Sequence, residues 1–175
     1  MKSTYQAGID HPASRIDLME WLSTLSDRDY QACSRSHRAA GTFREAGTLG
    51  MVNVESIGGH LLVQHYLAVK TAPNHVVMRS KNSRVYVMHL VPATIEVIWT
   101  LQIDRKDSQS CTLYCTVETR MPAFLNFVAT LGLLPLFLRW HVQEEALLFA
   151  RDMARKAGDA MLVEGTPSMS NRAAR

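Results

Sequence analysis

The stretch that decides the fold is RWHVQEEALLFARDMARK, residues Arg139 to Lys156, because it is typical of a long helix placed after a series of strands. Its apolar residues recur at intervals of three and four, the spacing of one face of an α-helix. The helix is expected from about Pro135 to Lys156. A helix that follows a whole antiparallel sheet buries its apolar stripe best by lying across the concave face of that sheet. The order of elements therefore predicts an α+β fold with a cavity between helix and sheet.

The preceding segment, from about Gly50 to Met121, alternates with the period of two that is typical of strands. Turn signals separate its runs, among them the Gly58–Gly59 pair and the polar Lys81–Ser83. The predicted strands are Met51–Ile57, His60–Lys70, His75–Ser80, Val85–Val91, Thr94–Asp104 and Cys111–Met121. Ser3–Ile9 is the only candidate for a strand near the N-terminus.

Two short helices are predicted before the strands, at about Ser14–Leu25 and Asp27–Ala39. Each begins with a pattern that resembles a capping box, with Asp in place of the usual Glu or Gln. The two pairs are Ser14 with Asp17 and Ser26 with Asp29. A polar, glycine-containing stretch, Thr42–Gly50, is expected to connect the second helix to the strands.

Alternation also assigns side chains to the two faces of the sheet. In His60–Lys70 the more apolar side carries His65 as its one polar member, so His65 is predicted to point inward, and Tyr66 lies on the other side. The inward side of this strand is predicted to carry Leu61, Val63, His65, Leu67 and Val69. In the last two strands the apolar sides include Trp99, Leu101 and Cys115. A sheet with one nearly apolar face is typical of an antiparallel sheet that is wet on one side.

The C-terminal helix has a broad apolar sector when its residues are placed at 100° intervals. The apolar members of this sector are Leu136, Trp140, Val142, Ala146, Leu147, Phe149, Ala150 and Met153. Arg139 and Gln143 fall inside the sector, so their polar groups are predicted to point toward the cavity. His141, Glu145 and Asp152 fall on the opposite side and are predicted to face water. Apolar walls with a few directed polar groups are the usual form of a ligand pocket.

The composition is that of one ordinary globular domain. The 175 residues, 47% apolar and 20% charged, are enough to build a hydrophobic core. The domain is predicted to span residues 1–158, and the polar residues 159–175 are expected to form a disordered tail. The net charge of +3 comes from scattered Lys and Arg residues, so no nucleic-acid partner is expected.

The cysteines and the apolar runs bear on location. Cys33, Cys111 and Cys115 are odd in number and lack a CxxC spacing, which predicts reduced thiols and a cytoplasmic protein. The N-terminal residues do not resemble a signal peptide. The apolar run Ala123–Leu138 is shorter than the ~20 residues of a spanning helix. A buried or partly ligand-facing segment is therefore favoured over a membrane contact.

Two strings carry a resemblance to a known superfamily: NVESIGGHLLVQHY, residues Asn53 to Tyr66, and the helix string Arg139 to Lys156. Together with the order of elements they resemble the helix-grip (SRPBCC) superfamily, in a branch of uncharacterised bacterial and fungal proteins. This superfamily includes START domains, plant Bet v 1-type proteins and bacterial polyketide cyclases. The resemblance covers about Gly50 to Gly158 and implies a curved antiparallel sheet wrapped around the long helix.

For function, the resemblance implies a cavity that binds a hydrophobic small molecule or lipid. Some relatives convert their ligand by acid–base chemistry, but the superfamily has no single shared catalytic residue to carry over. The cone-shaped fold of nuclear-transport-factor-like proteins is the structural alternative, and it usually ends in strands rather than in a long helix.

Two functions fit these expectations. The first is a cofactor-free cyclase, dehydratase or isomerase (lyase-type) of polyketide-like secondary metabolism. His65 would move the proton, while Arg139 and Gln143 would stabilise developing oxyanion charge. The other predicted ligand-binding residues are Val63, Tyr66, Trp99, Leu101, Cys115 and Ala146. The second function is a non-catalytic lipid or hydrophobic-ligand carrier, in which His65 is a core histidine with a hydrogen-bond partner. Either protein would be a monomer or a homodimer.

A metal site at His60 and His65 is considered and set aside. Their spacing resembles the iron-binding histidines of Rieske-type oxygenases, and Glu144 or Glu145 could complete a two-histidine, one-carboxylate set. Residues five apart in a strand face opposite sides, however, and the acidic residue expected three positions before His60 is Ile57. We therefore expect no metal and no cofactor.

Overall fold

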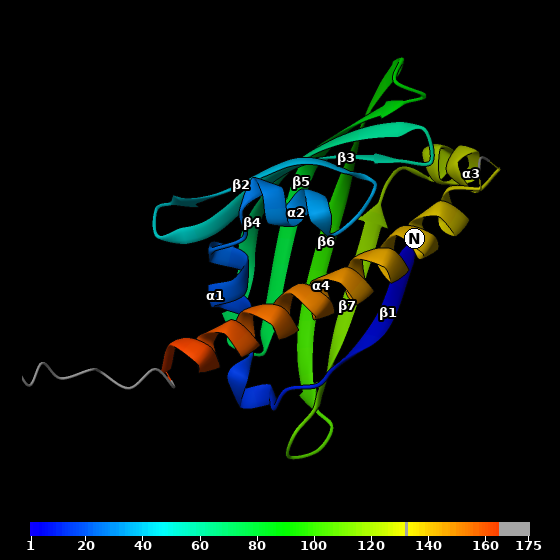
Figure 1. Cartoon of the computed structure of the whole chain (residues 1–175). Helices are drawn as coiled ribbons and strands as arrows, with labels where there is room; N and C mark the ends of the chain where they lie inside the picture. Colours follow the sequence, from blue (N-terminus) through cyan, green and yellow to red (C-terminus); the bar gives the residue numbers. More distant parts are fainter. Residues whose placement is uncertain (132, 165–175) are drawn as a thin grey trace, which may run out of the picture.

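The computed structural model describes residues 1–131 and 133–164. Within them it contains one antiparallel sheet of seven strands, two short N-terminal helices and a long C-terminal helix (Figure 1). The strands are β1 (Lys2–Ile9), β2 (His37–Glu45), β3 (Thr48–Ile57), β4 (His60–Ala72), β5 (His75–Val87), β6 (Val91–Arg105) and β7 (Cys111–Arg120). The helices are a 3-10 turn at Ala13–Arg15, α1 (Leu18–Ser23), α2 (Asp27–Ala32), α3 (Ala123–Leu131) and α4 (Leu134–Glu164). This is the α+β helix-grip architecture expected from the sequence.

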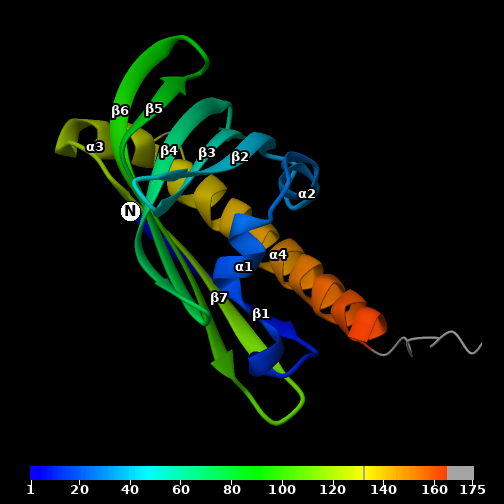
Figure 2. The ribbon, with the colours of Figure 1, turned by 90° about the vertical axis from the view of Figure 1, so that its left-hand side faces the viewer.

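The sheet has the strand order β1-β7-β6-β5-β4-β3-β2. Strands β2 to β7 form a meander, and β1 joins it at the far edge by pairing with β7 from Lys2 opposite Glu118 to Ile9 opposite Cys111. The candidate strand Ser3–Ile9 is thus confirmed. Figure 2 shows the curved sheet with α1, α2 and α4 on the same side of it. These helices cover the concave face, where the core forms.

Positive backbone angles shape two of the hairpins. Gly58 and Gly59, between β3 and β4, have φ angles of 57° and 81°, a region that glycine enters without steric cost. The pair forms the expected turn. Ala46 and Gly47, with φ angles of 48° and 82°, form the turn between β2 and β3.

The end of the second helix and the strand after it differ from the prediction. Ser26 caps α2 as expected, because its side chain accepts a hydrogen bond from the backbone N–H of Asp29. The helix then ends at Ala32, seven residues before the predicted Ala39, and the chain enters β2. Strand β2 lies at the edge of the sheet and most of its residues are exposed or half-buried, so it has no strong apolar alternation to reveal it.

The first helix also begins later than predicted. Asp17, not Ser14, is its N-cap, and the Asp17 carboxylate accepts hydrogen bonds from the backbone N–H groups of Met19 and Glu20. Ser14 lies in the preceding 3-10 turn.

The two predicted strands His75–Ser80 and Val85–Val91 are one strand, β5, whose pairing with β6 is interrupted by a bulge between Ser80 and Ser83. The bulge lets Lys81 and Asn82 face solvent while both serine side chains stay buried and hydrogen-bonded to each other at 2.8 Å. The turn that ends β5 comes later, at Met88–Leu90.

The apolar run Ala123–Leu138 forms α3 and the start of α4, separated near Leu133, whose φ angle is 59°. Pro135 sits in the first turn of α4, where a missing N–H group is tolerated. Helix α4 continues to Glu164, past the expected end at Lys156, so residues 159–164 of the predicted tail are helical. Residues 165–175 of that tail lie outside the described residues. No helix in the described part of the chain has the length and apolar character to cross a membrane.

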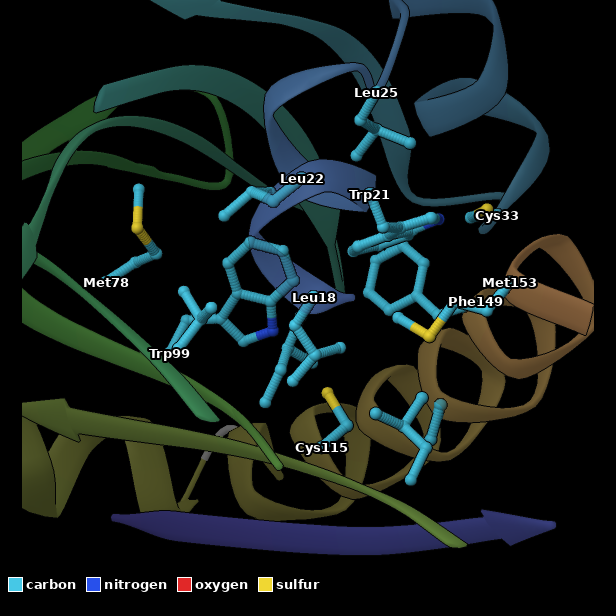
Figure 3. Packing of buried hydrophobic residues seen from close by; sticks show 14 of the residues in the cluster. Leu18, Trp21, Leu22, Leu25, Cys33, Met78, Trp99, Cys115, Phe149 and Met153 are labelled. Atoms are coloured by element: carbon cyan, nitrogen blue, oxygen red, sulfur yellow. The ribbon is translucent and has the colours of Figure 1, made fainter. Parts of the chain in front are cut away.

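The core lies between the concave face of the sheet and the helices. Side chains of α1, the sheet and α4 meet there, with Trp21 against Phe149 and with Trp99 facing both helices (Figure 3). Ala146 and Ala150 are buried on α4, as predicted, together with Val142, Phe149 and Met153. Three other members of the predicted sector point outward instead: Leu136, Trp140 and Leu147 are 38%, 54% and 40% exposed.

Candidate functional site

Two adjoining chambers lie between the sheet and the first turns of α4. The outer chamber has a volume of about 300 Å³ and is bounded by the β3–β4 turn, the tip of the β5–β6 hairpin, α3 and the start of α4. Its walls are mostly apolar and include Val85, Ala93, Ile95 and Met121. A chamber of this size is at the small end of the range for ligand pockets.

The inner chamber is smaller and lies deeper. Its volume of about 30 Å³ has room for about two water molecules. Four residues line both chambers, so the two adjoin: Ile57, Leu62, Thr119 and Leu138. The inner chamber is also lined by Tyr66 and Trp99 and by a group of polar side chains from β3, β4 and α4.

Four ionisable side chains meet beside the inner chamber: His37 from β2, Glu55 from β3, and His141 and Glu145 from α4. All four are buried, with 3 to 5% of each residue exposed. His37 Nε2 lies 3.2 Å from Glu145 Oε1, and His141 Nε2 lies 3.6 Å from Glu55 Oε2 and 3.8 Å from Glu145 Oε2. We call these four residues the buried cluster.

Hydrogen bonds hold both imidazoles of the cluster in place. His37 Nδ1 lies 2.6 Å from the backbone carbonyl oxygen of Tyr30. The imidazole of His37 also stacks on the phenol ring of Tyr30, with the two ring centroids 3.7 Å apart. His141 Nδ1 lies 3.4 Å from Ser34 Oγ, which donates its own proton to Glu144 at 2.7 Å. The Nε2 atoms of both histidines therefore face the carboxylates.

The carboxylate of Glu55 is anchored by a second set of bonds. The Tyr30 hydroxyl donates to Glu55 Oε1, and Asn53 Nδ2 donates to the same oxygen at 2.8 Å. Glu145 Oε2 lies 3.8 Å from the thiol sulfur of Cys115. Neighbours from β3, β7 and α2 thus fix the orientation of both carboxylates.

Burial and mutual attraction act in opposite directions on the ionisation of the cluster. Burial would lower the pKa of His37, but its hydrogen bond to Glu145 and the nearby carboxylates outweigh that effect and raise the pKa. Burial would raise the pKa of Glu145, but His141 and His37 outweigh it and lower the pKa. Burial raises the pKa of Tyr30 well above its usual value, so its hydroxyl stays neutral and donates.

Four buried polar atoms in the described residues lack a hydrogen-bond partner, and all four belong to residues that line the inner chamber. They are Asn53 Oδ1, Gln64 Oε1, Trp99 Nε1 and Thr119 Oγ1. Buried polar groups are nearly always paired, so a concentration of unpaired ones marks a place where water or a ligand completes the bonding.

Several predicted ligand-binding residues lie at or near this site. Tyr66 and Trp99 line the inner chamber, and Cys115 contacts Glu145. Leu101 and Ala146 are fully buried in the packed core and line neither chamber.

The predicted inward face of β4 is wrong. His65 is exposed and stacks on Phe43 on the outer face, and Val63 shares that face. The inward side chains are those at the even positions, including Leu62, Gln64 and Tyr66. The physical reason is that β4 turns its more polar side inward, where Gln64 lies directly opposite Asn53 of β3 at the inner chamber. His65 therefore lies outside the cavity, on the opposite face from His60, which lines the outer chamber.

The predicted orientation of α4 is also wrong at its polar positions. Arg139 is exposed and Gln143 is half-buried, and neither lines a chamber. His141 and Glu145, predicted to face water, point into the protein. The reason is the same: their partners Glu55 and His37 offer a polar environment inside the sheet, so the apolar sector is not the only face that the helix can bury.

No protein-family model matches the sequence, and no curated protein matches it. The structure is similar to a number of solved structures, among them the following three. The Zhui aromatase/cyclase from Streptomyces sp. R1128 has a TM-score of 0.64 at 10% identity, over 89% of this chain and 94% of that one. The protein TTHA0849 from Thermus thermophilus has a TM-score of 0.61 at 11% identity, over 91% and 99% of the chains. A START superfamily protein from Mycobacterium smegmatis has a TM-score of 0.50 at 12% identity, over 94% and 99%.

These similarities establish the fold, which is the START-like helix-grip fold that the sequence resembles. At such low identity they carry no residue assignments.

Proposed function

We propose that the protein binds a hydrophobic small molecule in the outer chamber, with a polar end in the inner chamber, and converts it by proton transfer in a cyclisation, dehydration or isomerisation. One observation carries the proposal: the apolar outer chamber adjoins the buried inner chamber, whose lining residues have hydrogen-bonding atoms without partners. Apolar walls supply affinity, and a few directed polar groups supply orientation.

The unpaired atoms indicate the chemistry of the polar end. Asn53 Oδ1 and Gln64 Oε1 are acceptors, which suit a hydroxyl of the ligand. Trp99 Nε1 is a donor with no neighbour inside strict hydrogen-bond geometry, although it also interacts with the nearby Cys115 thiol, and it suits a carbonyl oxygen. An apolar molecule that carries both a hydroxyl and a carbonyl group, as polyketide-like compounds do, meets these requirements.

The reaction requires a C–H bond next to a carbonyl group to break. The proton passes to a carboxylate or imidazole of the buried cluster, and the electron pair moves into the carbonyl to form an enolate. The enolate then takes this proton back at another atom, attacks a second carbonyl carbon whose new alkoxide takes the proton, or expels a β-hydroxyl group that takes the proton and leaves as water. That an aromatase/cyclase is among the similar structures supports this class of reaction.

Binding is tested by filling the outer chamber. Ala93→Trp places an indole in the chamber and should abolish binding of the apolar fluorescent probe anilinonaphthalene sulfonate, measured by its fluorescence. Ala39→Trp, on the exposed face of the edge strand β2, is the matched control and should bind like the wild type. Equal binding by wild type and Ala93→Trp would exclude the outer chamber as the ligand site.

Proton transfer is tested with a simple apolar ketone, α-tetralone, in heavy water. Wild-type protein should accelerate deuterium incorporation beside the carbonyl, and Glu55→Gln should lower that rate by about 10²–10⁴-fold. The affinity of Glu55→Gln for the probe should stay within about tenfold of the wild type, because Glu55 is proposed to act on the transition state and does not line the outer chamber that binds the probe. Probe binding without any acceleration of exchange would favour the alternative function, a non-catalytic carrier.

A further inference from the structure

We propose that the buried cluster of His37, Glu55, His141 and Glu145 binds one divalent first-row transition metal ion. Two imidazole nitrogens and two carboxylate oxygens would be its ligands, and these four atoms all lie within 4.8 Å of one another. In a tetrahedral site with bonds of about 2.0–2.1 Å, neighbouring ligand atoms are about 3.4 Å apart. Three nitrogen–oxygen separations in the cluster lie close to that value: 3.2 Å from His37 to Oε1 of Glu145, 3.6 Å from His141 to Glu55, and 3.8 Å from His141 to Oε2 of Glu145.

The hydrogen bonds of the two histidines leave the correct nitrogen for a metal. A metal-binding histidine usually donates its other ring N–H to a carbonyl, carboxylate or similar group, which fixes the tautomer. His37 has this arrangement, because Nδ1 faces the Tyr30 carbonyl oxygen at 2.6 Å and Nε2 faces the carboxylates. His141 repeats it, because Nδ1 faces Ser34 Oγ, whose proton is already donated to Glu144.

The carboxylates are held in the same way. Glu55 uses Oε1 for its bonds with Tyr30 and Asn53, which leaves Oε2 free toward His141. Glu145 reaches both histidines with its two oxygens. Residues outside the cluster therefore position His37, His141 and Glu55 before an ion arrives, and Glu145 is held by the two histidines and the Cys115 thiol, which lowers the cost of organising the site.

Charge balance favours a divalent ion. With neutral imidazoles the cluster carries a charge of −2, and burying uncompensated charge is costly. Among the described residues, no lysine or arginine lines the inner chamber to compensate it. The charge of a divalent cation would balance that of the two carboxylates.

A separate observation points to a ligand at the same place. Asn53 and Gln64 are 3% and 2% exposed, and each has an unpaired side-chain oxygen beside the inner chamber. The chamber has room for water next to Glu55, His141 and Glu145. A molecule in the inner chamber would reach an ion in the cluster only as a fifth ligand, and the unpaired oxygens would accept hydrogen bonds from it.

The donor set indicates the class of metal. Imidazole nitrogen with carboxylate oxygen suits Zn²⁺, Mn²⁺ or Fe²⁺, while Mg²⁺ and Ca²⁺ prefer oxygen ligands alone. A bound ion would act as a Lewis acid on a carbonyl oxygen in the inner chamber. Only that role rests on the proposed function, since binding of the ion requires no organic ligand. The expectation that no metal binds rested on His60 and His65, which take no part in this cluster.

The test uses the full chain without an affinity tag, freed of metal with a chelator and titrated with Zn²⁺ in a calorimeter. Wild-type protein should bind one ion per chain. Glu145→Gln should bind at least about 100-fold more weakly, and Ser34→Ala, which removes an orienting group, about 10–100-fold more weakly. The matched controls His65→Asn and Glu118→Gln lie outside the cluster and should bind like the wild type.

A second measurement protects the test against variants that do not fold. Co²⁺ should give wild-type protein and His65→Asn the visible absorption of four-coordinate cobalt with nitrogen and oxygen ligands. Wild-type protein without this spectrum, or with only several weakly held zinc ions per chain, would overturn the proposal. Equal loss of zinc in His65→Asn and Glu145→Gln would do the same. Ala93→Trp should keep zinc while losing the apolar probe, so failure of the metal site and failure of the ligand chamber are distinguishable.

Discussion

Phe149 joins α4 to the rest of the core, and its replacement tests how that helix is held. The side chain is fully buried, and its ring lies 5.0 Å from the ring of Trp21 and 5.7 Å from that of Trp99, measured between centroids (Figure 3). Replacing a buried Phe by Ala typically costs about 3–5 kcal/mol in free energy of unfolding. The two aromatic contacts each add about 0.5–1.5 kcal/mol beyond the buried area, so we expect a loss near the upper end, about 4–5 kcal/mol.

The assay is urea unfolding followed by far-ultraviolet circular dichroism. Phe149→Ala should move the midpoint to lower urea with little change in slope, because the surface exposed on unfolding is nearly the same. Leu147→Ala, two residues away on the same helix but 40% exposed, is the control and should cost less than about 1 kcal/mol. Equal losses for the two variants would refute the orientation of α4 described here, and with it the placement of the buried cluster.

Three further predictions concern other buried groups. Tyr30→Phe should lower the free energy of unfolding by about 1–3 kcal/mol in the same urea assay, because it leaves Glu55 without the hydroxyl proton that it accepts. Burial alone would raise the pKa of Asp152, but hydrogen bonds, led by that from Lys156, lower it. A lowered pKa stabilises the fold above the unfolded-state value near 3.9, and this effect is lost as pH falls from there through the lower folded-state value. Asp152→Asn should therefore reduce the melting temperature at about pH 7, and the reduction should shrink as the pH falls below about 3.9 and through the folded-state pKa. Burial raises the pKa of the Cys33 thiol from 9.0 to about 12, so iodoacetamide should modify it much more slowly in the native protein than in urea, as followed by mass spectrometry.

The parts of the fold that follow from local periodicity were predictable from the sequence. Strands β6 and β7 alternate cleanly, so Trp99, Leu101 and Cys115 were placed on the correct face. The Gly58–Gly59 turn and the long final helix have equally local signals. Strand β2 has none, because an edge strand with exposed faces needs no apolar alternation.

Side-chain orientation in β4 and α4 could not be predicted by counting apolar residues. That method assumes that the apolar side is the buried side. In β4 the side with Val63 is the more apolar, yet the side with Gln64 faces the core, because Asn53 and the inner chamber lie opposite it. A tertiary partner decides the face in such a case, and a partner far away in the sequence leaves no trace in the strand itself.

The two errors of orientation have one cause, and that cause is informative about function. Both occur where ionisable or amide side chains from distant segments gather inside an apolar concavity: His37 and Glu55 from the sheet with His141 and Glu145 from the helix. Burying such groups is expensive, and an apolar replacement of similar shape is often at least as stable. The spacing of His141 and Glu145 is the one local signal of this cluster, since residues four apart lie on the same face of a helix. Local rules fail here at several positions that converge on one point in space, as they do at functional or strained sites, and this convergence supports the ligand site and the metal site that we propose there.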